Sequence, residues 1–222
     1  MENKNYKCMK CYGENIGDHG LYCSKAVPPK PILDACCSGR MFWFDKKNPN
    51  CLYCDIRKVP KGTLKNSPNF SIEPDKVMDF RNMDLPDKSF KLVVFDPPHL
   101  KSLDKNSWIS VKYGSLDEDT WKFDILKGFN ECWRVLDDYG TLIFKWSKSG
   151  DNRRRRDVSI ENLLKILPVR PLFGHPSGSK INTIWFCFMK IPDNSSTEYS
   201  KYGSECTGDH RTCGHMYTCR RN

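Results

Sequence analysis

The feature that most constrains the fold of this chain is a series of short apolar runs that each lead into an aspartate. The runs that begin at Ile32, Cys51 and Lys76 lead to Asp34, Asp55 and Asp79, and the run Phe90–Phe95 is followed by Asp96. Short apolar runs bounded by polar and turn-forming residues are typical of buried β-strands. We therefore expect four strands that each carry a carboxylate at the carboxyl end.

The rest of the chain continues this alternation with helices between the strands. Phe90–Phe95 is almost uninterrupted apolar sequence, which predicts a central strand buried on both faces, and the two prolines after Asp96 prevent its continuation. The apolar residues of Asp119–Leu136 recur three and four apart, which predicts an amphipathic helix. Strands are also expected at Gly140–Trp146, Val169–Phe173 and Asn182–Met189, a short helix at Ser159–Leu167, and a polar connection at Lys101–Glu118.

These elements predict an α/β fold: a Rossmann-like, doubly wound, mainly parallel sheet of seven strands. The last two strands are joined by only a short turn rich in Gly, Pro and Ser, which leaves no room for a helical crossover. They are therefore expected to form an antiparallel hairpin at one end of the sheet.

A chain of 222 residues fits one α/β domain with short extensions. We divide it into a Cys/His-rich N-terminal extension (1–27), the domain itself (28–191) and a polar, Cys/His-rich tail (192–222). No segment reaches the roughly 18 apolar residues of a membrane span, and the start of the chain lacks the apolar core of a signal peptide. We expect a cytoplasmic protein with no membrane partner, and we make no prediction of its oligomeric state.

The strand ends gather the residues that are best suited to bind a ligand, because ligands of open parallel sheets bind outside the carboxyl ends of the strands. Asp55, after the second strand, is placed to accept the hydroxyl protons of a ribose. Asp79 is a candidate acceptor for an adenine amino group, or it marks the neighbouring loop. The small residues at positions 35–39 let a cofactor approach the backbone closely.

The segment Asp96-Pro97-Pro98-His99 is the strongest chemical signal in the chain. An exocyclic amine of a base is a poor nucleophile, because its lone pair is delocalised into the ring. The carboxylate of Asp96 and the carbonyl of Pro97 offer two acceptors for its N–H groups, and the successive prolines make the loop rigid. The ring of His99 is then available to stack on a flat substrate.

Together these residues resemble the class I S-adenosylmethionine-dependent methyltransferases, and the Asp-Pro-Pro-His loop resembles the [Asp/Asn]-Pro-Pro-[Tyr/Phe/Trp] motif of enzymes that methylate amino groups of nucleic acids. More narrowly, the ordered motifs at 32–37, 41–46, 79–83, 93–100 and 140–147 look like a small methyltransferase family carried by phages and bacterial mobile elements, which would place the protein in the host cytoplasm. The resemblance covers about residues 31–190. It implies catalysis by Asp96, Pro97, Pro98 and His99. It also implies that S-adenosylmethionine is the cofactor and is held by Asp34, Ala35, Cys36, Ser38, Gly39, Asp55, Asp79 and Phe80.

The leading hypothesis is thus methyl transfer to an exocyclic amino nitrogen of a DNA or RNA base. The formal net charge of +9 is compatible with a nucleic-acid partner, although a solvated basic surface would look the same. The run Arg153–Arg156 carries the same two interpretations. Two alternatives stay open: a methyltransferase for a small-molecule or protein amine, and a zinc-stabilised nucleic-acid-binding protein with a catalytically idle fold.

The cysteines divide into two groups. Those in or beside apolar runs are expected to pack as small buried hydrophobes: Cys36, Cys37, Cys51, Cys54, Cys132 and Cys187. Strand alternation turns Cys51 and Cys54 to opposite faces, so their CxxC spacing is not interpreted as a metal or redox site. In the N-terminal extension the candidate zinc ligands are Cys8, Cys11, His19 and Cys23, with a flexible arm as the alternative. The tail carries a second set, Cys206, His210, Cys213, His215 and Cys219, either as a zinc site or in a disordered tail.

Overall fold

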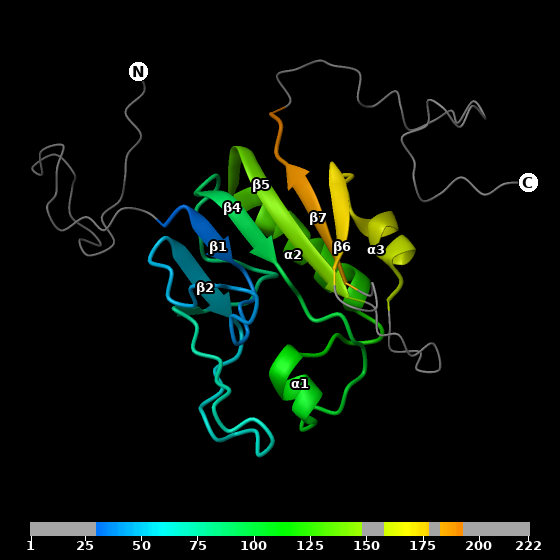
Figure 1. Cartoon of the computed structure of the whole chain (residues 1–222). Helices are drawn as coiled ribbons and strands as arrows, with labels where there is room; N and C mark the ends of the chain where they lie inside the picture. Colours follow the sequence, from blue (N-terminus) through cyan, green and yellow to red (C-terminus); the bar gives the residue numbers. More distant parts are fainter. Residues whose placement is uncertain (1–29, 148–157, 178–182, 193–222) are drawn as a thin grey trace, which may run out of the picture. The chain divides into compact units, whose positions relative to one another are not determined.

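The computed structural model describes residues 30–147, 158–177 and 183–192, which contain a seven-stranded sheet (Figure 1). The strands are β1 (Ile32–Asp34), β2 (Cys51–Asp55), β3 (Lys76–Val77), β4 (Phe90–Phe95), β5 (Leu136–Ser147), β6 (Phe173–Ser177) and β7 (Thr183–Met189). The helices are α1 (Trp108–Tyr113), α2 (Trp121–Val135) and α3 (Ile160–Ile166). The strand order is β3-β2-β1-β4-β5-β7-β6, and only β7 runs antiparallel to its two neighbours. The predicted fold class is confirmed.

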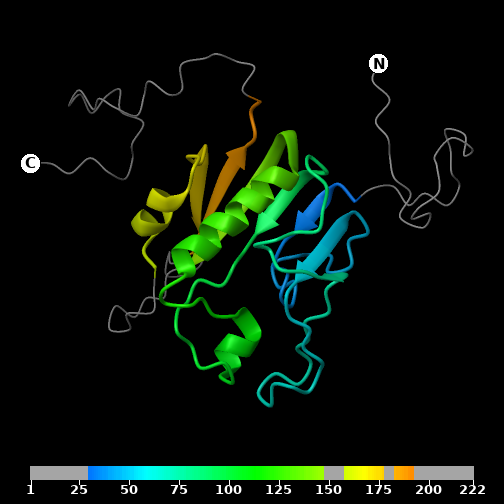
Figure 2. The ribbon, with the colours of Figure 1, turned by 180° about the vertical axis from the view of Figure 1, so that it is seen from behind.

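Helix α2 covers one face of the sheet, over β4 and β5 (Figure 2). Its side chains Ile125, Phe129 and Cys132 have no exposed surface, and they follow the spacing of three and four that predicted the helix. They pack against Val93 and Phe144 of the two central strands in the main core cluster. The apolar face of α2 therefore fixes β4 and β5, the strands that lead to the candidate site.

Irregular segments instead of helices connect β1 to β2 and β2 to β3. After β1 the chain folds back so that Trp43 packs edge-on against Tyr53 of β2, and Cys51 joins this second cluster. Cys54 belongs to the main core cluster. The prediction that Cys51 and Cys54 face opposite ways is confirmed, as is the burial of the strand cysteines; Cys187 is half-buried.

The hairpin is confirmed, but its first strand lies further along the chain than the sequence predicted. The predicted strand ended at Phe173, where β6 begins, and the residues assigned to the turn pair with β7, for example His175 with Trp185 and Pro176 with Ile184. Proline usually interrupts a sheet because it has no N–H to donate. Here β6 is an edge strand with only one neighbour, so the missing donor is tolerated.

Helix α1 lies inside the stretch that the sequence predicted to be a polar connection. Its N-cap Ser107 accepts a hydrogen bond from the backbone N–H of Ser110, and it ends at Gly114, whose φ of +79° favours glycine. A helix of six residues is too short to produce a recognisable apolar period.

Within the described ranges, none of the helices is both long and apolar enough to cross a membrane.

Candidate active site

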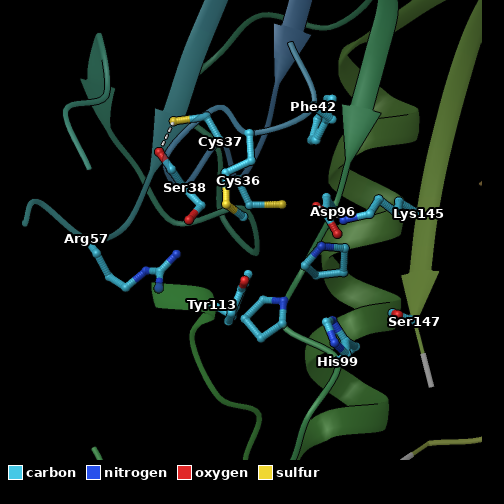
Figure 3. Close-up of a pocket in the computed structure, with 13 residues that line it drawn as sticks. Cys36, Cys37, Ser38, Phe42, Arg57, Asp96, His99, Tyr113, Lys145 and Ser147 are labelled. Carbon is cyan, nitrogen blue, oxygen red and sulfur yellow. Dashed lines mark hydrogen bonds and ion pairs between the residues drawn. The ribbon is translucent and has the colours of Figure 1, made fainter. Parts of the chain in front are cut away.

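A cavity of about 400 Å³ opens where the carboxyl ends of β1 and β4 lie side by side (Figure 3). From β1 the chain continues toward β2 and β3 on one side, and from β4 toward β5 on the other, so the cavity lies at the switch point of the sheet. Its lining consists of Cys36, Cys37, Ser38, Met41, Phe42, Arg57, Asp96, Pro97, Pro98, His99, Tyr113, Lys145 and Ser147. All four predicted catalytic residues line it, together with two of the eight predicted cofactor residues, Cys36 and Ser38.

Asp96 forms an ion pair with Lys145 of the neighbouring strand β5. The Lys145 Nζ lies 2.6 Å from Oδ2 of Asp96, and both side chains are about one-fifth exposed. Burial raises the pKa of Asp96, and the positive charge and hydrogen bond of Lys145 oppose that rise. Oδ1 of Asp96 and the carbonyl of Pro97 accept no hydrogen bond from any residue that the structure describes. Both acceptors proposed from the sequence therefore remain available.

His99 presents an uncharged ring to the same cavity. Burial, with a smaller contribution from the charge of Lys145, lowers the pKa of His99 to about 4. Its ring packs edge-on against Trp146 of β5, with 6.3 Å between the centroids. At neutral pH the imidazole is thus a neutral flat group that packs against a core tryptophan, and such a ring can stack on a base.

The segment that carries α1 closes another side of the cavity. The hydroxyl of Ser38 donates a hydrogen bond to the carbonyl of Lys112 at 2.7 Å, and Nη1 of Arg57 donates to the carbonyl of Val111 at 3.1 Å. Gly114 is needed at this contact, since a Cβ at this position would lie 2.7 Å from Cγ of Pro98. The loop after β1 and the Asp-Pro-Pro-His loop are therefore both tied to this segment.

Asp55, which the sequence suggested as an acceptor for a ribose, is buried, and its carboxylate is already hydrogen-bonded within the protein. It is 2% exposed, and its two oxygens accept hydrogen bonds from the backbone N–H of Ser38 and from the backbone and guanidinium of Arg57. The physical reason is that Arg57, two residues further on, folds back and forms an ion pair with it.

Asp79 repeats this arrangement at the end of β3. Arg81 donates to it from Nε and Nη2 and also reaches Asp124 of α2. The side chain of Phe80, between the two, packs edge-on against Phe95 of the core. Neither Asp79 nor Phe80 lines the cavity. Both strand ends carry the sequence Asp-x-Arg, and this local signal marks acids that are bound by their own neighbour.

Asp34 has no exposed surface and does not line the cavity. Its oxygens accept hydrogen bonds from the indole N–H of Trp43 at 2.7 Å and from the backbone N–H of Cys36 at 3.4 Å. Burial raises the pKa of Asp34 to about 7, and the charges of Asp96 and Asp55 add to this rise. Ala35, also predicted to contact the cofactor, is buried, and Gly39 lies against Phe70 instead of lining the cavity.

The raised pKa of Asp34 gives an expected pH dependence of stability. Folding favours the protonated carboxyl, so its contribution is complete below the unfolded pKa of 3.8 and is lost as the pH rises through about 7. The free energy of unfolding of Asp34→Asn, measured relative to wild type, should therefore rise by about 2 kcal/mol between pH 5 and pH 8. Denaturant titrations at several pH values measure it. A difference that stays constant across this range would show that Asp34 has an ordinary pKa. His99 titrates in both proteins alike and cancels in the difference.

Other segments supply side chains that complete the site and that had no role in the prediction. Lys145 and Phe42 were part of quoted motifs without an assigned role, and Arg57 and Tyr113 were not identified. Lys145 lies beside the rings of Phe42 and Trp185, with its Nζ 5.7 and 5.6 Å from their centroids. The sequence signal that could have identified Lys145 was the presence of a lysine inside a strand that is otherwise buried.

Several predicted features lie outside the described residues: the N-terminal zinc candidates Cys8, Cys11, His19 and Cys23, those of the tail, and the run Arg153–Arg156. Over residues 30–147, 158–177 and 183–192, no group of three or more His, Cys, Asp or Glu side chains is arranged to hold a metal ion.

Neither a protein-family model nor a curated protein matches this chain. Among solved structures it is similar to the PH0226 protein of Pyrococcus horikoshii, with a TM-score of 0.46 and 15% identity over 72% of this chain and 81% of that one. The N-methyltransferase NodS of Bradyrhizobium japonicum gives a TM-score of 0.44 and 14% identity over 72% of this chain and 85% of that one. The 1,6-didemethyltoxoflavin-N1-methyltransferase of Burkholderia thailandensis gives a TM-score of 0.42 and 12% identity over 72% of this chain and 71% of that one. All three are backbone similarities at low sequence identity.

Proposed function

We propose that this protein is an S-adenosylmethionine-dependent methyltransferase that acts on an exocyclic amino nitrogen of a DNA or RNA base. The observation that carries the proposal is the pair of free acceptors, Oδ1 of Asp96 and the carbonyl of Pro97, at a cavity that His99 also lines. Such a pair matches the two N–H groups of an amino substituent. It has no comparable use in a site that only binds phosphate, because phosphate oxygens mainly accept hydrogen bonds.

The residues of the cavity fit a cationic cofactor. Asp55 and Asp96 each raise the pKa of Asp34, and both already have a cationic partner, in Arg57 and Lys145. Asp34 is therefore the carboxyl group whose charged form a further positive charge nearby would stabilise most. S-adenosylmethionine supplies an electrophilic methyl group on a sulfonium cation. Cys36 and Ser38 would lie against it with small side chains. A ribose at Asp55 would have to share that carboxylate with the Arg57 guanidinium.

The chain's own contribution to the reaction is to position and activate the amine. Asp96 and the Pro97 carbonyl accept hydrogen bonds from the two N–H groups, which draws the nitrogen out of conjugation and directs its lone pair toward the methyl group. After transfer the nitrogen must lose a proton. The raised pKa of Asp96 makes this carboxylate a suitable acceptor.

A nucleic-acid substrate is favoured over a free small molecule by the net charge of +9 and by the neutral, stacking ring of His99. A small-molecule amine is the alternative substrate. A protein that binds no oligonucleotide would favour this alternative. Zinc in the N-terminal extension, a cytoplasmic location and an origin in phages or mobile elements remain proposals from the sequence.

Calorimetric titration with S-adenosylmethionine tests the proposal at its first step. We expect saturable binding at one site per chain, and the heat should depend on buffer ionisation near pH 7, because a cation in the cavity promotes the loss of the Asp34 proton. A titration without binding would exclude the methyltransferase and leave the catalytically idle nucleic-acid-binding protein as the remaining hypothesis.

A further inference from the structure

The Asp96–Lys145 ion pair uses only part of the hydrogen-bonding capacity of each partner. An ammonium has three donors, and among the described residues Lys145 donates one hydrogen bond, to Oδ2 of Asp96. Asp96 keeps Oδ1 free. Because both side chains line the cavity, a ligand there meets an acceptor and a donor side by side.

The position of Lys145 is fixed on several sides. Its backbone is paired within the sheet, with Trp185 of β7 as its partner residue, and its ammonium lies beside the rings of both Phe42 and Trp185. These two rings contact each other edge-on, with 5.3 Å between their centroids. Figure 3 shows Lys145 and Asp96 directed toward one another, with Phe42 on one side of them. A donor held in this way can select among ligands.

An acceptor next to a donor is complementary to an amino group whose carbon also carries an acceptor, which is either the unprotonated ring nitrogen of an aminated heterocycle or the oxygen of a carboxamide. Of these two groups, the flat heterocycle also matches the ring of His99 in the same cavity. The amino group donates to Asp96, and the ring nitrogen accepts from Lys145. Adenine and cytosine both present this amidine edge. An alkylamine has no adjacent acceptor, and it is protonated at neutral pH because its pKa is about 10.4, which leaves no lone pair to attack the methyl group.

We propose that Lys145 determines substrate specificity by donating a hydrogen bond to the ring nitrogen beside the methylated amino group. The inference rests on the proposed function and narrows its substrate to N-heterocycles with an amidine edge. Alkylamines, and aromatic amines without the ring nitrogen, are then poor substrates.

Removing the ring nitrogen from the substrate tests this directly. The probes are single-stranded oligonucleotides with adenine or 1-deazaadenine, and with cytosine or 3-deazacytosine; the deaza bases keep the amino group and replace the ring nitrogen by C–H. For the base that the wild type methylates, kcat/KM should fall about 10- to 100-fold in the deaza oligonucleotide, the usual effect of losing a hydrogen bond to a charged group. In Lys145→Met the same replacement should cost less than about threefold, whereas Lys145→Arg should keep the discrimination.

The readout is the ratio between the two substrates in each variant. Lys145→Met also deprives Asp96 of its partner, but that loss lowers activity on both substrates alike and leaves the ratio unchanged. If Lys145→Met is too unstable to assay, Lys145→Gln, which retains a donor, should show intermediate discrimination. Equal discrimination by wild type and Lys145→Met would overturn the proposal, as would transfer by the wild type to spermidine with adenine and cytosine left unlabelled. A failure of the proposed function would show itself separately, as a lack of S-adenosylmethionine binding.

Discussion

Replacing Asp96 by alanine is expected to lower kcat/KM for methyl transfer by a factor on the order of 10²–10³, the usual cost of removing one preorganised polar group at a reacting centre. The affinity for S-adenosylmethionine should change little, because Asp96 is proposed to contact the incoming amine. Rate assays and calorimetry on the same preparation measure the two effects. A variant that loses cofactor binding as well as activity would move Asp96 from the substrate side of the site to the cofactor side.

Asp96→Asn is an informative second variant, because Lys145 determines which way the amide group faces. The amide has only one oxygen, and the ammonium of Lys145, 2.6 Å from Oδ2 in the wild type, attracts it and turns the NH₂ group toward the substrate amine. We therefore expect Asp96→Asn to be nearly as impaired as Asp96→Ala. In the double variant Asp96→Asn, Lys145→Met the oxygen is free to face the substrate. Activity on the deaza oligonucleotide, which does not use the Lys145 donor, should therefore rise above that of Asp96→Asn.

Replacing Asp55 by alanine is expected to destabilise the fold by about 3 kcal/mol, the lower end of the range for a broken buried ion pair. The change leaves the buried N–H of Ser38 and the guanidinium of Arg57 without their acceptor. The lower end applies because Arg57 is 24% exposed and regains some hydration. Urea unfolding without cofactor measures the loss.

The matched control is Asp84→Ala. Asp84 also pairs with a basic residue, Lys76, but its side chain is 97% exposed, so its loss should cost less than about 1 kcal/mol. Equal losses for Asp55→Ala and Asp84→Ala would contradict the structural role of Asp55. Because Asp55 supports the fold, its proposed ribose contact should be tested in a variant whose stability has been measured first. An example is the cofactor affinity of Asp55→Asn compared with that of the wild type.

The strands and the main helix could be predicted because burial leaves a local pattern. Four of the six residues of Phe90–Phe95, and the residues of α2 that follow the spacing of three and four, have mostly buried side chains, whereas Lys91 is exposed and Leu92 half-buried. The predicted position of the Asp-Pro-Pro-His loop follows from the same pattern. Two prolines cannot continue a central strand, so the chain leaves the sheet at the carboxyl end of β4. Helix α1 and the true start of β6 were missed, because short edge and surface elements depend on caps and pairing more than on apolar period.

The partners of the site residues could not be predicted in the same way. Lys145 reaches Asp96 across 49 positions of sequence, because β4 and β5 are neighbours in the sheet, and no local pattern encodes that pairing. Asp55 shows the opposite case. Its partner is two residues away, and the repeated Asp-x-Arg of positions 55–57 and 79–81 was legible in the sequence, but only the structure shows that the arginines fold back onto the acids.

The most direct test of the account is to incubate the wild-type protein with methyl-labelled S-adenosylmethionine and mixed single-stranded DNA and RNA, digest the products and identify the labelled nucleoside. The account predicts label on an exocyclic amino nitrogen, as N-methylated adenine or cytosine, and at least a hundredfold less label with Asp96→Ala. Label on a carbon or oxygen atom, or an Asp96→Ala variant as active as the wild type, would contradict it.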